Sequence, residues 1–353
     1  MQMSYSTSTY SMTFGLRRSI ATMQEMLGRH QKELTTGRIA DPGVSLGSGA
    51  RMGYILQNNL EETRAILATN RRITIRVDAT QNALANLQQT AEAMRATFLV
   101  SQDNVTDPEA LASQARTSLA LLVSTLNSDD GDGFLFGGQR SDTAPIADYF
   151  APTLSPARMA LDAALIDPVA GFGFPADSPQ VAQLTTQRIA EFIDGSFADL
   201  FSEASWKSQW SSASDAVLEN RISLHQTIDA SMSANDPALR KIAMAYVMVS
   251  ELGISGMTND GARTLIRKAT ATLDEGMALL KTSRARVGVM QQSIEIADEN
   301  LQSYSDMLEI EATRLGAVDR SETATRINEV LTRIETAYAL TARISQLSLT
   351  RYI

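Results

Sequence analysis

The sequence contains no cysteine and only two histidines, His30 and His225. Without cysteine there is neither a disulfide framework nor a thiolate that could act as a nucleophile or metal ligand. The two histidines lie far apart in the chain, which argues against a histidine-based metal site or a catalytic triad. We therefore assign no catalytic, cofactor-binding or metal-binding residue and do not expect an enzyme.

Long apolar runs are also missing. No run approaches the length of a membrane span, and residues 1–14 lack the apolar core of a cleaved secretion signal. The net charge is −9 and there is no stretch rich in Lys or Arg, so neither nucleic acid nor a membrane is expected as a partner. Aromatic residues make up only 6% of the chain, which suits long helices with a narrow hydrophobic stripe.

The strongest pattern that is present is a strict seven-residue repeat of aliphatic residues. It predicts one long helix that holds a single seam against a partner. A second track beside it mixes small and large residues, which favours a larger bundle over a two-stranded zipper. The repeat consists of Ile266, Leu273, Leu280, Val287, Ile294, Leu301, Leu308 and Leu315.

The main partner of this repeat is predicted to be a second long helix over residues 52–98. These residues keep a spacing that alternates between four and three without a slip. Asn59 and Asn70 would cost stability in a dry seam but are suited to fixing the register of two helices. The apolar seam of this helix includes Ile66, Ile73, Val77, Leu84 and Leu87.

Both ends of the chain predict shorter helices, each with one apolar stripe. The first helix runs from Thr13 to a C-cap at Gly37, and the last follows a capping pair at Asp319 and Glu322. One interpretation is that these helices only close the bundle; the other, which we favour, is that they assemble with neighbouring copies. The proposed assembly residues are Leu16, Ile20, Met23, Leu27 and Leu34 in the first helix, and Ile327, Ile334, Tyr338, Ile344 and Leu347 in the last.

The middle of the chain, residues 131–215, holds most of the prolines and shows no long period. We expect a small insert that packs separately, with a short strand at 134–138 and helices at 159–166 and 181–193. Trp206 and Trp210 are expected in its core, the alternative being a ligand anchor. Residues 216–233 alternate loosely and allow a β-hairpin.

The predicted fold is mainly α: an elongated antiparallel helical bundle or coiled coil built from both chain ends, with a small mixed central insert. Residues 1–44 with 317–353 are predicted to form the terminal helix pair. Residues 45–132 with 216–316 form the long bundle, which includes the hairpin. Residues 133–215 form an insert that faces outward.

Three stretches of the chain resemble the flagellin family. Residues 33–38 (ELTTGR) stand where the family has its L-S-S/T-G-K/R turn, and residues 133–138 (GFLFGG) resemble its Y-L-F-G/A-G motif. Residues 334–353 resemble the ending A-x-Y-x-x-x-A-R/K-I-x-x-L-S-L of the family branch that joins the flagellar hook to the filament. The usual R-I-N…D-D-A-A-G turn is replaced by RIADPG at residues 38–43.

The resemblance implies a structural subunit of the bacterial flagellum that is not an enzyme. Such a chain is exported unfolded by the flagellar type III apparatus without a cleaved signal and acts outside the cell. It forms a ring of identical copies between hook and filament, next to a hook-associated protein and flagellin, and an export chaperone on the C-terminal helix is a further candidate partner. The alternatives are a filament-forming flagellin and, from another class, a cytoplasmic coiled-coil signalling or chaperone protein.

Deleting residues 334–353 is expected to leave a folded middle but to abolish the joining of hook and filament, because the deletion removes one terminal stripe. Circular dichroism of the purified chain checks the fold, and a swimming assay checks the joining. Retained motility in a strain that carries only the truncated chain would contradict the assembly role of the last helix.

Overall fold

The computed structural model describes the chain except residues 1–8, 42, 44–46, 152–153 and 350–353, and the side chains of 9–13, 48 and 345–349 also lie outside this description. Four long helices dominate the described part: α1 (Thr9–Thr36), α3 (Ser48–Ser101), α9 (Asn259–Gly316) and α10 (Arg320–Leu349). A small sheet and several short helices complete it. The predicted mainly α fold with a small mixed insert is confirmed.

The chain forms two compact units. The first contains Met1–Ala65 and Gln302–Ile353, and the second contains Ile66–Leu301. Helices α3 and α9 contribute residues to both units. The division into three parts that the sequence suggests remains a prediction.

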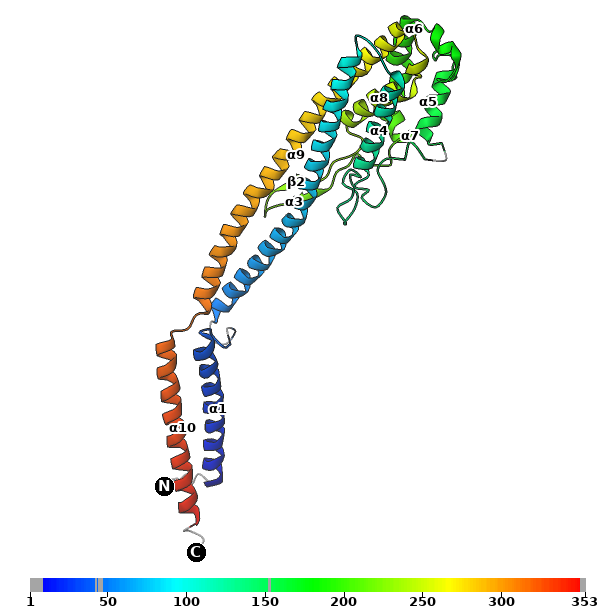
Figure 1. Cartoon of the computed structure of the whole chain (residues 1–353). Coiled ribbons are helices and arrows are strands. Elements are labelled where there is room, and N and C mark those ends of the chain that lie inside the picture. The colour runs from blue at the N-terminus through cyan, green and yellow to red at the C-terminus, as the bar shows by residue number, and fades with distance from the viewer. Residues whose placement is uncertain (1–8, 42, 44–46, 152–153, 350–353) are drawn as a thin grey trace. The chain divides into compact units, whose positions relative to one another are not determined.

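Within the second unit, α3 and α9 lie side by side and run in opposite directions (Figure 1). Side-chain hydrogen bonds define the register, since the partner's number falls along α9 as the residue number rises along α3. These bonds join Asn70 to Asp298, Asp78 to Gln291, Gln88 to Arg284 and Arg95 to Asp274.

The seam between the two helices is buried and largely apolar, and Asn70 is one of the polar residues within it. Asn70 is fully buried, and its Nδ2 donates to the Ile222 carbonyl oxygen at 2.8 Å and to Asp298 Oδ1 at 2.6 Å. Because the side-chain amide nitrogen is hydrogen-bonded on both sides, much of the cost of burying it is offset. Asn70 therefore ties the hairpin region to both long helices at one position.

The second unit also contains α4 (Pro108–Leu126) and α8 (Pro237–Glu251), which pack against each other. Each helix begins at an Asp-Pro pair. The side chain of Asp107 accepts a hydrogen bond from the Ala110 amide, and that of Asp236 accepts one from the Ala238 amide. An N-cap acceptor followed by proline at the first helical position is a strong start signal, which explains why both helices begin where the sequence places them.

A hairpin precedes α8. Its strands, β1 (Glu219–Arg221) and β2 (Thr227–Asp229), pair antiparallel with Asn220 opposite Ile228. This agrees with the alternation seen in residues 216–233. The two strands form the one sheet of the described residues.

The segment from 133 to 215 contains α5 (Pro156–Ile166), α6 (Thr186–Phe192) and α7 (Glu203–Gln209), with short helical turns η1 (Pro179–Gln183) and η2 (Ile193–Phe197). The helix expected at 159–166 is present as α5. The single helix expected at 181–193 is wrong: Thr185 caps a new helix by accepting from the Arg188 amide, so η1 and α6 are separate. A further turn, η3 (Ile254–Gly256), links α8 to α9.

The strand expected at 134–138 is also wrong. These residues form turns with isolated bridges from Phe134 to Asp129 and from Gly137 to Ser233. Gly138 has φ +62°, and a Cβ atom there would lie 2.3 Å from the Ser214 carbonyl oxygen. A left-handed residue packed this tightly against another backbone segment does not continue a strand.

The expectation that residues 133–215 pack separately is wrong as well. Their buried side chains belong to the same hydrophobic core as those of α3, α4, α8 and α9. Trp206 and Trp210 are buried and stacked with ring centroids 5.0 Å apart, and Trp206 Nε1 donates to the Ala234 carbonyl oxygen just before α8. Both tryptophans are therefore core residues.

The contact between α8 and α9 depends on a helical glycine, which yields a stability test. A Cβ atom on Gly276 would lie 2.9 Å from Ile242 Cγ1 and 3.1 Å from the Ile242 amide nitrogen. Gly276→Ala is expected to destabilise the second unit by about 1–3 kcal/mol, because the added methyl group overpacks this contact. Urea unfolding followed by circular dichroism measures the change.

Gly288 in the same helix provides the matched control, since no atom lies within 4 Å of a Cβ added there. Gly288→Ala is expected to stabilise the chain by about 0.5–1 kcal/mol through the lower backbone entropy of the unfolded state. Equal effects of the two substitutions would contradict the close approach of α8 and α9.

Candidate assembly site

The terminal helices α1 and α10 pack against each other along their apolar stripes (Figure 1). Each contributes a short row of buried residues, with Met26 and Leu27 partly buried beside them. At the edge, Gln24 Nε2 donates to the Tyr338 hydroxyl oxygen at 3.1 Å. The buried row consists of Ile20, Met23, Val330, Ile334 and Ala337.

The proposed assembly residues whose side chains are described thus divide into three groups, buried, partly exposed and exposed. Ile20, Met23 and Ile334 are buried between α1 and α10 within one chain. Tyr338 is 52% exposed, and Leu347 lies outside the described side chains. The remaining five are partly exposed: Leu16, Leu27, Leu34, Ile327 and Ile344.

The apolar surface that this pair leaves uncovered is formed largely by other residues. Phe14 is 62% exposed on α1, and on α10 Leu331 and Leu340 are 38% and 48% exposed, close to Tyr338 in sequence. Phe14, Leu331 and Leu340 were not among the predicted site residues. The seven-residue spacing of Leu331 and Tyr338 is a signal that could have revealed the α10 part of this surface.

The seam residues lie in several clusters along α3 and α9. Leu308 packs with Leu56 and Leu60 in the first unit. In the second unit, Ile66 and Leu301 pack together in a separate small cluster. The main core of that unit contains Ile73, Val77, Leu84, Leu87, Ile266, Leu273, Leu280, Val287 and Ile294.

The first unit contains two connectors: the segment that follows α1 and the segment between α9 and α10. Backbone hydrogen bonds join these two connectors. Arg38 and Ala317 form an isolated antiparallel bridge; the Ile39 amide donates to the Gly316 carbonyl at 2.9 Å, and the Val318 amide donates to that of Gly37 at 3.1 Å. Gly37 has φ +70°, which a residue with a Cβ atom rarely adopts. The chain thus leaves α1 and enters α10 through one two-stranded junction.

A buried carboxylate fastens α1 to its connector. Glu33 Oε2 lies 2.8 Å from His30 Nδ1, and Glu33 Oε1 accepts a hydrogen bond from the Ala40 amide at 3.1 Å. Burial alone would raise the pKa of Glu33, but these two hydrogen bonds, with positive charge on His30 and Arg326, outweigh it. The pKa of Glu33 is therefore held below its usual value of 4.5.

A cavity of about 750 Å³ adjoins the connector junction in the first unit, lined by the connector that follows α1 and by the facing ends of α3 and α9. The ion pair between Arg64 and Glu309 lies on its wall. Arg38, Tyr54 and Leu315 also line it.

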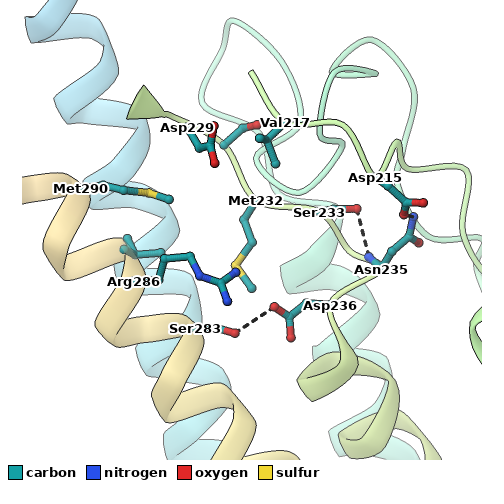
Figure 2. A pocket seen from close by; sticks show the side chains of 12 residues that line it. Asp215, Val217, Asp229, Met232, Ser233, Asn235, Asp236, Ser283, Arg286 and Met290 are labelled. Atoms are coloured by element: carbon teal, nitrogen blue, oxygen red, sulfur yellow. Dashed lines mark hydrogen bonds between the residues drawn. The ribbon is translucent and has the colours of Figure 1, made fainter. Parts of the chain in front are cut away.

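A smaller pocket of about 220 Å³ lies in the second unit between α9 and the loop from β2 to α8. Figure 2 shows Arg286 reaching from α9 toward Met232 and Asp236. Asp236 caps α8 and accepts a hydrogen bond from Ser283 Oγ at 2.8 Å, while Asn235 Nδ2 donates to Asp215 at 2.8 Å. The Ser283 bond fastens the loop to α9 and the Asn235 bond fastens it to the segment before β1, so the pocket is a product of packing.

Among the described residues, no three His, Cys, Asp or Glu side chains are grouped so that they could hold a metal ion. Within the same residues, no helix combines the length and the hydrophobicity needed to cross a bilayer.

Comparison with known families identifies the class of protein. Residues 7–136 match the model of the bacterial flagellin N-terminal helical region, and residues 270–353 match that of the bacterial flagellin C-terminal helical region. Together the two models cover more than half of the chain. The chain belongs to the flagellin family, a family of structural, non-enzymatic proteins of the bacterial flagellum that act outside the cell and assemble with other flagellar proteins.

A solved structure has a similar fold. It is described as a flagellar hook-associated protein from Vibrio parahaemolyticus, with a TM-score of 0.52 and 10% sequence identity. The alignment covers 77% of this chain and 99% of that chain. At this identity the likeness concerns the fold alone. No curated protein sequence matches the chain.

The Glu33 contact yields a prediction about pH. A carboxyl group whose pKa is lower in the folded than in the unfolded state stabilises the fold above its unfolded pKa, and this contribution is lost as the pH falls through the folded value. Hydrogen-exchange protection of the Ala40 amide, corrected for the intrinsic rate, is therefore expected to fall below pH 4.5. Hydrogen exchange with mass spectrometry measures it.

In Glu33→Gln, the hydrogen-exchange protection of the Ala40 amide is expected to be low at neutral pH as well, because the neutral side-chain amide cannot replace the charged acceptor. Glu25→Gln, at an exposed position of the same helix, is the matched control and should behave like the unmodified chain. An unchanged pH profile in Glu33→Gln would refute the fastening role of this carboxylate.

Proposed function

We propose that the chain is the subunit that joins the hook of the bacterial flagellum to its filament. The observation that carries this proposal is the C-terminal run from Ile334 through Tyr338 to Leu349, which resembles the ending of the junction branch of the flagellin family. The similarity in fold to a protein described as hook-associated supports it. The subunit forms a ring of identical copies, with a hook-associated protein on one side and flagellin on the other.

The terminal helix pair is the part of the chain that makes the joining contacts. Because Ile20, Met23 and Ile334 already cover each other within one chain, the surface offered to a neighbour is the exposed set of Phe14, Leu331, Tyr338 and Leu340 together with the partly exposed stripe residues. Exposed apolar side chains at seven-residue spacing suit helix-to-helix contact between subunits. In this proposal Phe14 and the exposed residues of α10 make the subunit contacts that the sequence alone assigned to the whole apolar stripes of the two terminal helices.

The route to this site follows from the same proposal. The chain is exported unfolded by the flagellar type III apparatus without a cleaved signal, and a chaperone covers the C-terminal helix before export. The absence of cysteine suits a chain that folds after export without oxidation. A segment with an exposed apolar stripe needs such cover in the cell, because it would otherwise associate with other copies.

The deciding experiment is electron microscopy of flagella from a strain that lacks this chain. Hooks without filaments are expected, because no subunit remains to present a surface for flagellin. A strain complemented with the unmodified gene is the control. Normal filaments in the deletion strain would overturn the junction role.

Adding purified protein to isolated hooks separates the junction subunit from a filament-forming flagellin. A junction subunit is expected to stop after a short ring, whereas a flagellin grows long filaments. A chain found only inside cells, and never in sheared flagella, would instead point to a cytoplasmic coiled-coil protein.

A further inference from the structure

The outward face of α9 in the second unit carries large apolar side chains that contact no other part of the described chain closely enough to be covered. Val289 and Ile296 lie seven residues apart and are 61% and 51% exposed. The same stripe, at alternating spacings of three and four, contains Thr282, Ala285 and Gln292, all exposed. We call these five residues the Ile296 face; its spacing is that of a seam for another helix.

The outward face of α3 carries a matching stripe. Ile75 is 64% exposed and lies directly opposite the buried seam residues Ile73 and Val77 on the helix. Ala68 and Arg72 share this face and are exposed, and Ala79, at its edge, is half-buried and packs against the main core. We call these four residues the Ile75 face. Its small alanines leave room around Ile75 for the larger side chains of a facing helix.

The two faces lie at the same level of the α3/α9 pair. The hydrogen bonds from Asn70 to Asp298 and from Gln291 to Asp78 place residues 70–78 of α3 beside residues 291–298 of α9. Ile75 and Ile296 fall inside this interval. In a ring whose axis runs parallel to these helices, equal levels of neighbouring copies face each other, and one copy's Ile75 then meets its neighbour's Ile296.

The charges beside the two faces have opposite sign. Arg71 and Arg72 are exposed next to Ile75, where the one acidic neighbour, Asp78, accepts a hydrogen bond from Gln291 of the same chain. Glu295 is exposed next to Ile296. Opposite charges at one level favour the contact of unlike faces, and like charges disfavour contact of either face with itself. The charge pattern therefore selects a second copy of this chain, placed head to tail, as the occupant.

We infer that the Ile75 face of each copy packs on the Ile296 face of the next, which forms a lateral contact in the ring. This inference rests on the proposed function and adds the surface through which neighbouring copies meet. Because the two faces differ, the contact is heterologous and each copy retains one free face of each kind until the ring closes.

Cysteine cross-linking in assembled flagella tests this contact without background, since the chain has no cysteine of its own. A double variant with Ile75→Cys and Ile296→Cys replaces the native chain, and isolated flagella are oxidised and run on a non-reducing gel. A ladder of covalent dimers, trimers and larger species is expected, because a disulfide requires the two Cα atoms to lie within about 7 Å.

Matched variants test whether cross-linking is specific to these two faces. Val100→Cys combined with Ile296→Cys has equally accessible thiols, since Val100 is 81% exposed, but Val100 lies about 25 residues along α3 from Ile75. This pair is expected to cross-link at least about tenfold less, because that spacing corresponds to about 38 Å of helix. Two single variants, I75C and I296C, expressed together with different tags should give only a dimer that carries both tags.

Several results would overturn the inference. A dimer from I75C alone would mean that like faces meet, and a ladder from the Val100 pair as strong as that from the Ile75 pair would mean random collision. Cross-links only to another flagellar protein would assign the face to that protein. Absence of the ladder from flagella whose hooks carry filaments would refute this contact but leave the junction role intact, whereas filaments in the deletion strain would refute the junction role itself.

Discussion

The antiparallel seam between α3 and α9 is the constraint on which the rest of the structure depends. Its seven-residue repeat keeps one face of each helix covered along many turns. The start of α3 and the end of α9 therefore lie next to each other in the first unit. There the connectors pair through the bridge between Arg38 and Ala317. The apposition of α1 and α10 is thus a consequence of pairing that is established in the long helices.

Apolar periodicity alone would leave the register of such a seam open, because a shift by one heptad covers nearly the same surface. Polar groups remove this freedom. Asn70 Nδ2 makes both of its hydrogen bonds only where Ile222 and Asp298 lie within reach. Arg76 fixes α3 against the turn before residue 135 by donating to Asp130 at 2.8 Å and to the Phe134 carbonyl oxygen at 2.5 Å. A shifted register would leave buried donors without acceptors, at a cost larger than the gain from the seam residues that would still pair.

Helices with a repeating stripe or a cap could be predicted from the sequence because their signals are local: the heptads of α9, the Asp-Pro starts of α4 and α8, and Gly37 after α1. The turn at 134–138 could not, because it depends on contacts with Ser214 and Arg76, which are distant in sequence. The shared core of residues 133–215 escaped prediction for the same reason, since Trp206 bonds to Ala234 across a chain separation that no pattern encodes. At the candidate site, both stripes could be read from the sequence, but not which residues would cover one another.

Because α1 and α10 bury part of each other's apolar stripe, only the rest of each stripe is open to a neighbouring copy. The buried row between α1 and α10 contains five residues, a small core for two helices of 28 and 30 residues. Helices whose apolar stripes are only partly covered gain further stability from each surface that a neighbour adds. A pair that is aligned by its connector junction and only lightly stabilised by its own core presents Phe14, Tyr338 and Leu340 in a fixed relation. In the proposed assembly, less ordering entropy then has to be lost when copies associate, and so more of the apolar contact between subunits contributes to the binding free energy.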